Sequence, residues 1–164
     1  MKFVLFYHSL LSDWNHGNAH FLRGIVSELQ ARGHQVDVYE PEDGWSRTQL
    51  LREHGAAALR DAAKRFPQLR STLYRLDALD LEQALDNADV ALVHEWNAPE
   101  LVAAVARQAP AGCKVLFHDT HHRSVSAPQE MARYDLSRYH GVLAFGEAIR
   151  QQYRERGWCE DVWT

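Results

Sequence analysis

The chain has 164 residues, a formal net charge of -4 at pH 7 and 46% hydrophobic residues. This composition is that of a soluble globular protein, and it excludes a disordered chain, a coiled coil and a nucleic-acid-binding protein with a basic surface. Two cysteines, Cys113 and Cys159, form no metal or disulfide motif, so we expect free thiols in a cytoplasmic protein. No segment reaches the ~20 apolar residues that a membrane span needs, so none is expected.

The first half of the sequence predicts the order strand, helix, strand, helix. Residues 3–7 form a continuous apolar run, which is typical of a strand buried on both faces. Residues 18–32 place apolar side chains at helical spacing and stop at a glycine. Residues 36–39 form a second strand, and residues 48–66 favour a helix, weakened by a central glycine. The short connections predict a parallel βαβ unit.

The second half alternates in the same way after residues 69–80, which show no clear period and allow no prediction. The expected elements are helices over 81–88, 97–108, 126–131 and 147–156 and strands over 90–93, 114–117, 141–145 and from 161 onward. Asn97 and Glu100 are spaced as in a capping box, which predicts the start of the second of these helices. The whole pattern predicts one three-layer α/β domain over residues 1–164 with a mainly parallel sheet.

Three of the predicted strands are followed directly by a histidine: His8, His94 and His118. Because the carboxyl ends of parallel strands meet at one edge of a sheet, where ligands bind, we expect these histidines to lie together. A fourth strand is expected to deliver Glu147 to the same edge, and Trp96 stands in one of the polar segments that follow the strands. Histidine, tryptophan and asparagine suit a hydroxyl-rich ligand, which needs directional hydrogen bonds and an apolar face to stack on.

Other interpretations of the histidines stay open at this point. Each of them can simply satisfy a buried carbonyl group. The run from His118 to His122 also allows a metal-dependent hydrolase, with His8 and His94 as further ligands. Its spacing matches no standard metal motif, and the positive charge of Arg123 would repel a cation, so we expect no metal. No GxGxxG or P-loop motif is present, so no cofactor is expected. A stand-alone binding domain is the third alternative.

Five segments carry a family resemblance that covers nearly the whole chain. They are residues 6–24, Arg32-Gly33-His34, residues 94–97, residues 118–123 and residues 144–147. These motifs resemble the bacterial glycosyltransferases of the spore-maturation-protein-like group, which are related to glycosyltransferase families 1 and 4. The resemblance implies the Rossmann-like N-terminal, acceptor-side domain of a GT-B enzyme. Such enzymes transfer a sugar from a nucleotide-sugar, which is bound mainly by a C-terminal domain that residues 1–164 do not include.

The polar segments and the resemblance together suggest which residues face the cleft. The expected catalytic residues are His16, His94, Glu95, His118 and Asp119. The expected substrate-binding residues are His8, Asn15, Gly17, Asn18, Trp96, Asn97, His121, His122, Arg123 and Glu147. The acceptor and the donor sugar are not specified by these motifs.

The chemistry of the reaction is also left open by the sequence. An inverting transfer needs a general base on the acceptor hydroxyl, for which a histidine paired with a carboxylate is suited, whereas a retaining transfer needs none. Because neighbouring residues on a strand point to opposite faces, neither His94 with Glu95 nor His118 with Asp119 is expected to form a dyad by itself. One wall of a cleft cannot hold donor and acceptor together, so we expect the chain alone to be inactive. Because Trp14 and Trp96 in the cleft loops would expose apolar faces, we also expect a weak homodimer through this face.

Overall fold

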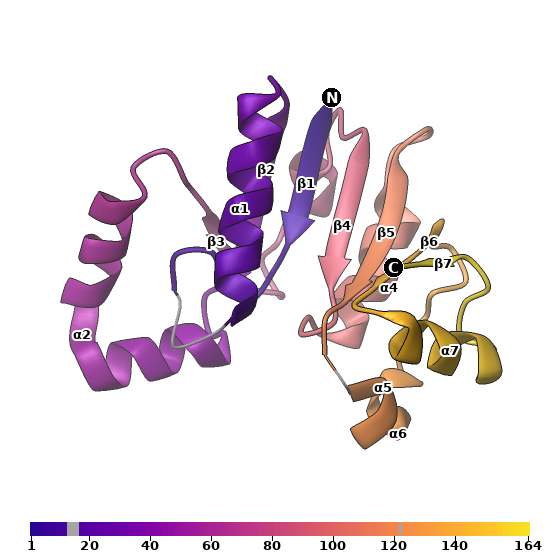
Figure 1. Cartoon of the computed structure of the whole chain (residues 1–164). Coiled ribbons are helices and arrows are strands. Elements are labelled where there is room, and N and C mark those ends of the chain that lie inside the picture. Colours follow the sequence, from indigo (N-terminus) through magenta and orange to yellow (C-terminus); the bar gives the residue numbers. More distant parts are fainter. Residues whose placement is uncertain (13–16, 122) are drawn as a thin grey trace. The chain divides into compact units, whose positions relative to one another are not determined.

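The structure, a computed structural model, describes residues 1–12, 17–121 and 123–164. It divides into two compact units, Met1–Leu79 and Asp80–Thr164, and each unit combines parallel strands with helices (Figure 1). Among the described residues, no helix has both the length and the apolar character required to cross a lipid bilayer.

The first unit contains three parallel strands in the order β3-β2-β1. Strand β1 (Lys2–Phe6) leads through helix α1 (Gly17–Ala31) to β2 (Gln35–Pro41), and helix α2 (Trp45–Arg65) leads to β3 (Thr72–Tyr74). The predicted parallel βαβ unit is therefore confirmed. Strand β3 lies in the segment that allowed no prediction, because three residues at the end of a sheet are too few to show a period of two.

The core of the first unit follows the predicted apolar positions. Leu5 and Phe6 of β1 are fully buried, as are Leu22 and Val26 of α1. Helix α2 changes direction at Gly55, whose φ of 65° and ψ of -177° lie in a region that glycine alone adopts without strain. Its two helical segments are visible in Figure 1. The glycine that weakens the predicted helix thus marks a sharp bend.

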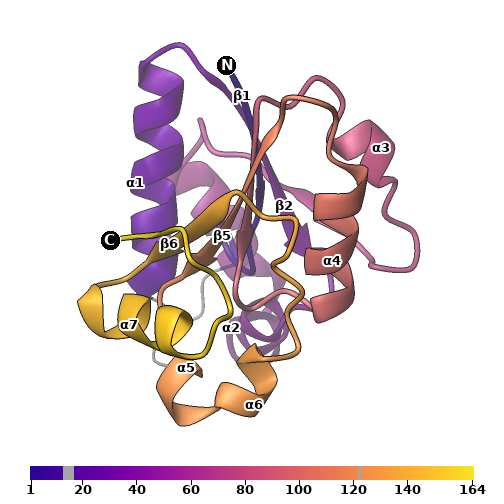
Figure 2. The same ribbon diagram turned by 90° about the vertical axis from the view of Figure 1, so that its right-hand side faces the viewer.

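The second unit contains four parallel strands in the order β4-β5-β6-β7. They are β4 (Val90–His94), β5 (Lys114–Asp119), β6 (Gly141–Ala144) and β7 (Val162–Trp163). The helices of this unit are α3 (Leu81–Ala84), α4 (Pro99–Gln108), α5 (Arg123–Ser126), α6 (Pro128–Met131) and α7 (Glu147–Glu155). Figure 2 shows α3 and α4 on one side of these strands and α7 on the other.

Two predicted helix starts in the second unit are wrong, and a proline explains both. Helix α4 begins after Ala98 without any side-chain cap, because Pro99 sets the helical φ of the first turn, and Asn97 is used elsewhere. Ser126 ends α5 and does not start the next helix, since α6 begins at Pro128, which cannot continue a preceding helix. The predicted class, a Rossmann-like α/β fold with parallel strands, is confirmed by the pairings within both units.

Candidate functional site

The carboxyl ends of β4 and β5 lie side by side in the second unit and carry most of the predicted site residues. His94 is paired in register with His118. The Glu95 amide donates a hydrogen bond to the carbonyl oxygen of His118 at 3.0 Å. The two imidazole rings meet edge to face, with 5.6 Å between their centroids. Parallel pairing thus brings two of the three strand-end histidines together.

The next residue on each chain segment is acidic, and neither side chain reaches solvent. Glu95 and Asp119 are both fully buried. Burial, together with the negative charge of the nearby Asp119 carboxylate, raises the pKa of Glu95 to about 8. Burial also raises the pKa of Asp119. Because two buried neighbouring carboxyl groups cannot both be ionised at low cost, the pair retains one proton at neutral pH.

Two hydrogen bonds favour the ionised form of Asp119. The hydroxyl of Tyr153, from helix α7, donates to Asp119 Oδ2 at 2.8 Å. The backbone amide of His121 donates to Asp119 Oδ1 at 3.1 Å. These bonds favour the ionised form of Asp119, while the pKa of Glu95 is raised to about 8, so Asp119 carries the negative charge and Glu95 carries the shared proton.

A chain of polar groups runs from His94 to Glu95 through Thr120. The backbone amide of Trp96 donates to His94 Nδ1 at 3.4 Å, and this contact assigns the proton of the neutral ring to Nε2. His94 Nε2 lies 2.9 Å from the Thr120 hydroxyl. Thr120 in turn donates to Glu95 Oε1 from its hydroxyl at 3.4 Å and from its amide at 3.0 Å. The position of the His94 ring is therefore coupled to the buried carboxyl pair.

An exposed indole borders this network. Trp96 exposes 43% of its surface, and the Arg123 guanidinium lies 4.6 Å from its ring centroid. Arg123 also donates to the Glu95 carbonyl oxygen at 2.9 Å and pairs with Glu130 at 2.8 Å. The His121 ring meets the indole edge to face, with 5.6 Å between centroids. These contacts hold the Arg123 guanidinium in place, and its cation–π contact fixes the orientation of the Trp96 ring.

Two further predicted residues are buried and have distinct properties. Burial lowers the pKa of His118 to about 4, so that its imidazole is neutral at physiological pH. Asn97 is buried, and its amide donates to the His94 carbonyl oxygen at 2.9 Å. This bond closes the turn after β4, so Asn97 holds the loop that presents Trp96.

The remaining predicted residues lie elsewhere in the described chain or outside it. His8 is buried and follows Tyr7 after the end of β1. Gly17 and Asn18 open helix α1, also in the first unit. Glu147 is exposed at the start of α7 and pairs with Arg150 at 3.1 Å. Trp14, Asn15, His16 and His122 lie outside the described residues.

The structure adds three residues that the sequence did not single out: Thr120, Tyr134 and Tyr153. Thr120 stands within the motif of residues 118–123, but its hydroxyl gains a partner only through strand pairing. Tyr134 donates a hydrogen bond from its hydroxyl to the Glu95 carbonyl oxygen. Tyr153 lies on a helical face together with buried Ile149, and that pattern indicates only a core position. No local signal marks either tyrosine as a partner of the acidic pair.

The described residues provide no obvious metal centre. Residues 1–12, 17–121 and 123–164 contain no group of three His, Cys, Asp or Glu side chains placed to hold a metal ion. The metal-dependent hydrolase therefore gains no support from the described part of the chain.

Parallel strands with helices around them and a buried polar network at their carboxyl ends define a Rossmann-like ligand-binding fold. The chain belongs to the glycosyl transferase 4-like domain family, whose sequence profile matches residues 16–162. The family resemblance expected from the motifs is thereby confirmed. The family and the fold together support a glycosyltransferase-type role.

Among solved structures, the chain is similar to an alpha-glucosyltransferase in complex with UDP and a 13-mer DNA containing a central A:G mismatch. The two share 14% sequence identity with a TM-score of 0.52, and the match covers 87% of this chain and 36% of that chain. At this identity the likeness supports the GT-B-type fold alone. No curated protein matches the chain.

Proposed function

We propose that this chain forms the acceptor side of a GT-B glycosyltransferase, which transfers a sugar from a nucleotide-sugar to an acceptor hydroxyl. The observation that carries the proposal is the buried pair of Glu95 and Asp119, coupled through Thr120 to His94 at the carboxyl ends of β4 and β5. Family membership supplies the reaction class, and this network supplies the polar groups that position an acceptor.

In this proposal the exposed and the buried residues have different roles. Trp96 offers an apolar surface on which a sugar ring stacks, and His121 beside it offers a hydrogen-bonding ring. His118 is neutral because of its burial, so it is able to accept a hydrogen bond from a hydroxyl group. Glu95 and Asp119 expose no surface, so we assign them a positioning role in place of direct contact with the substrate.

The same residues serve either stereochemical course. In a retaining transfer, His118 orients the acceptor hydroxyl, while His94, which exposes no surface, supports the His118 ring edge to face. In an inverting transfer, His118 also takes the proton of this hydroxyl. The anomeric configuration of the product, measured by NMR, distinguishes these two courses.

The proposal is tested by measuring nucleotide release from a panel of uridine and guanosine diphosphate sugars. One sample contains the 164-residue chain, and the other contains the chain joined to the donor-binding domain of a related glycosyltransferase. We expect acceptor-dependent turnover only in the second sample, because transfer requires donor and acceptor to be held in contact. Absence of turnover with every donor in both samples would contradict a transferase. Sustained turnover by the chain alone would contradict its assignment to one side of a cleft.

A further inference from the structure

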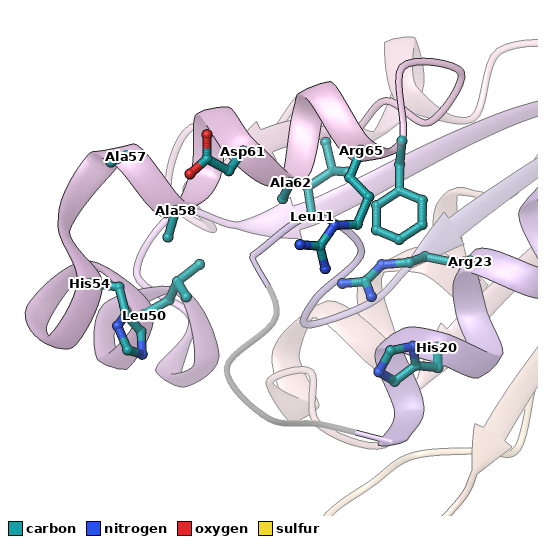
Figure 3. Close-up of a pocket in the computed structure, with 11 residues that line it drawn as sticks. Leu11, His20, Arg23, Leu50, His54, Ala57, Ala58, Asp61, Ala62 and Arg65 are labelled. Atoms are coloured by element: carbon teal, nitrogen blue, oxygen red, sulfur yellow. The ribbon is translucent and has the colours of Figure 1, made fainter.

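A second candidate site lies entirely within the first unit. Helices α1 and α2 line an open pocket of about 560 Å³, drawn in Figure 3. None of its lining residues belongs to the network around Glu95 and Asp119.

The pocket exists because of the sequence of the second segment of α2. Ala57, Ala58, Asp61, Ala62 and Arg65 recur at intervals of three and four residues, so they lie on one face of the helix. The three alanines leave space between this face and α1, where longer side chains would fill it. Gly55 separates this segment from the preceding one and allows it to take a different direction.

Two arginines from different helices meet in the pocket. Arg23 of α1 and Arg65 of α2 direct their guanidinium groups into the same space in Figure 3. Arg23 is 8% exposed, donates from Nε to the Leu10 carbonyl oxygen at 2.8 Å, and lies 4.7 Å from the Phe66 ring centroid. These contacts fix its position before any ligand arrives. Arg65 is exposed, and its side chain forms no hydrogen bond or ion pair with any residue that the structure describes.

The other lining residues add little negative charge. Of the described lining residues, Asp61 alone is acidic. Its carboxylate points away from the two guanidinium groups in Figure 3 and pairs with Lys64 at 3.8 Å. His20 and His54 contribute imidazole rings to the same opening. The described lining therefore combines cationic and hydrogen-bond-donating groups, with an apolar wall of alanine and leucine side chains.

We propose that this pocket binds an oxyanion, a phosphate or a carboxylate, carried by the acceptor. A guanidinium group presents paired N–H donors that match the oxygen atoms of these anions, and the prepositioned Arg23 lowers the entropy cost of the contact. The apolar wall accommodates the neutral part of the molecule. The assignment of the anion to the acceptor depends on the proposed function, whereas the binding of an oxyanion does not.

The test measures the binding of inorganic phosphate and glucose 1-phosphate to the full chain by calorimetry and by NMR, with glucose as the neutral probe. We expect both anions to bind, glucose 1-phosphate more tightly, and glucose to give no shifts at the pocket. R65Q should weaken binding of the anions roughly tenfold, as expected for the loss of charge-assisted hydrogen bonds. R60Q removes the same charge from an exposed position on α2 outside the pocket, so it should leave binding unchanged.

Three results would overturn the proposal: no binding of either anion, equal binding of glucose, or equal losses in R65Q and R60Q. Circular dichroism of both variants verifies that α2 is intact. Nucleotide-sugar turnover is measured separately. Arg65-dependent anion binding by the chain, without turnover when the chain is joined to the donor-binding domain, would contradict the proposed transferase and leave the oxyanion pocket established.

Discussion

Glu95 and Asp119 follow the paired residues His94 and His118, so that two carboxyl groups from neighbouring strands meet in a site without solvent. This cross-strand pair, and not a histidine with the carboxylate next to it in sequence, is the acidic centre of the second unit. Its proton, its link to Tyr153 and its coupling to His94 make the pair accessible to experiment.

The first prediction concerns the pH dependence of stability. The pKa of Glu95 is raised from 4.5 to about 8 in the folded chain, so the folded state binds a proton that the unfolded state releases in this interval. Stability should therefore fall as pH rises toward 8, by about 1.4 kcal/mol per pH unit for one group. E95Q mimics the protonated form and should remove this slope.

Urea denaturation of the wild-type chain and E95Q between pH 6.5 and 8 measures how the free energy of unfolding changes with pH. This range lies above 6.5, the ordinary pKa of histidine, so protonation of His118 does not contribute to the slope. Parallel slopes for the wild-type chain and E95Q would show that Glu95 is ionised in the folded state.

The second prediction concerns His118. Burial lowers its pKa from 6.5 to about 4, so its imidazole should stay neutral throughout the range in which exposed histidines titrate. Because the unfolded state binds the proton first, His118 should make the chain less stable as pH falls from 6.5 to 4. Nitrogen-15 NMR of the histidine rings measures the protonation state of His118 directly as the pH is changed. Titration of His118 near 6.5 would mean that the ring is in contact with water.

The third prediction compares two buried tyrosines. Y153F removes the donor to Asp119 Oδ2, whereas Y139F removes a donor to the neutral Val102 carbonyl oxygen at 2.8 Å. Loss of a hydrogen bond to a charged acceptor costs more than loss of one to a neutral carbonyl. We therefore expect Y153F to lower the free energy of unfolding by ~1–3 kcal/mol and Y139F to lower it by less.

Y153F should also raise the apparent pKa of the acidic pair, and Y139F should not. Thermal unfolding across the pH range measures both effects. Equal losses with no change in pH dependence would indicate that Tyr153 contributes packing alone.

The fourth prediction uses two glycines. A Cβ at Gly141 would lie 2.1 Å from the Trp163 ring and 2.6 Å from the Asp161 carbonyl oxygen, so G141A should destabilise the β6–β7 pair by ~1–3 kcal/mol. Gly24, inside α1, has nothing within 4 Å of the same position, so G24A should stabilise by ~0.5–1 kcal/mol. Denaturation midpoints compare the two. A stable G141A would mean that β7 is not required for the fold.

The fifth prediction tests the role of Trp96 and depends on the proposed function. W96A should raise the KM for the acceptor about tenfold, since it removes a stacking surface while the buried network stays in place. W45A removes another exposed indole, which lies in the first unit, and it should leave the KM unchanged. Initial rates of the chain joined to a donor-binding domain provide both values. A lower kcat with unchanged KM would instead assign Trp96 to the position of the loop.

The local pattern of the chain was sufficient to predict most of its elements. Apolar runs gave the strands β1, β4, β5 and β6, and helical spacing gave α1 and α7 within a residue or two. The predictions failed where a proline or the shortness of an element outweighed the hydrophobic period. These places are the start of α4, the break at Pro128 and the three-residue strand β3. The strand-end motifs also placed His94, Glu95, His118 and Asp119 correctly at one edge of the second unit.

By itself, therefore, the sequence determined the parallel α/β class, the family and the edge at which polar residues gather, because strand and helix periods and short motifs are local properties. Only the tertiary structure decided which groups interact. Strand register brings Glu95 to Asp119, helix α7 brings Tyr153 to the same carboxylate, and the bend at Gly55 allows Arg65 to face Arg23. Each of these contacts joins residues distant in sequence, and burial then sets their protonation, which no local pattern specifies.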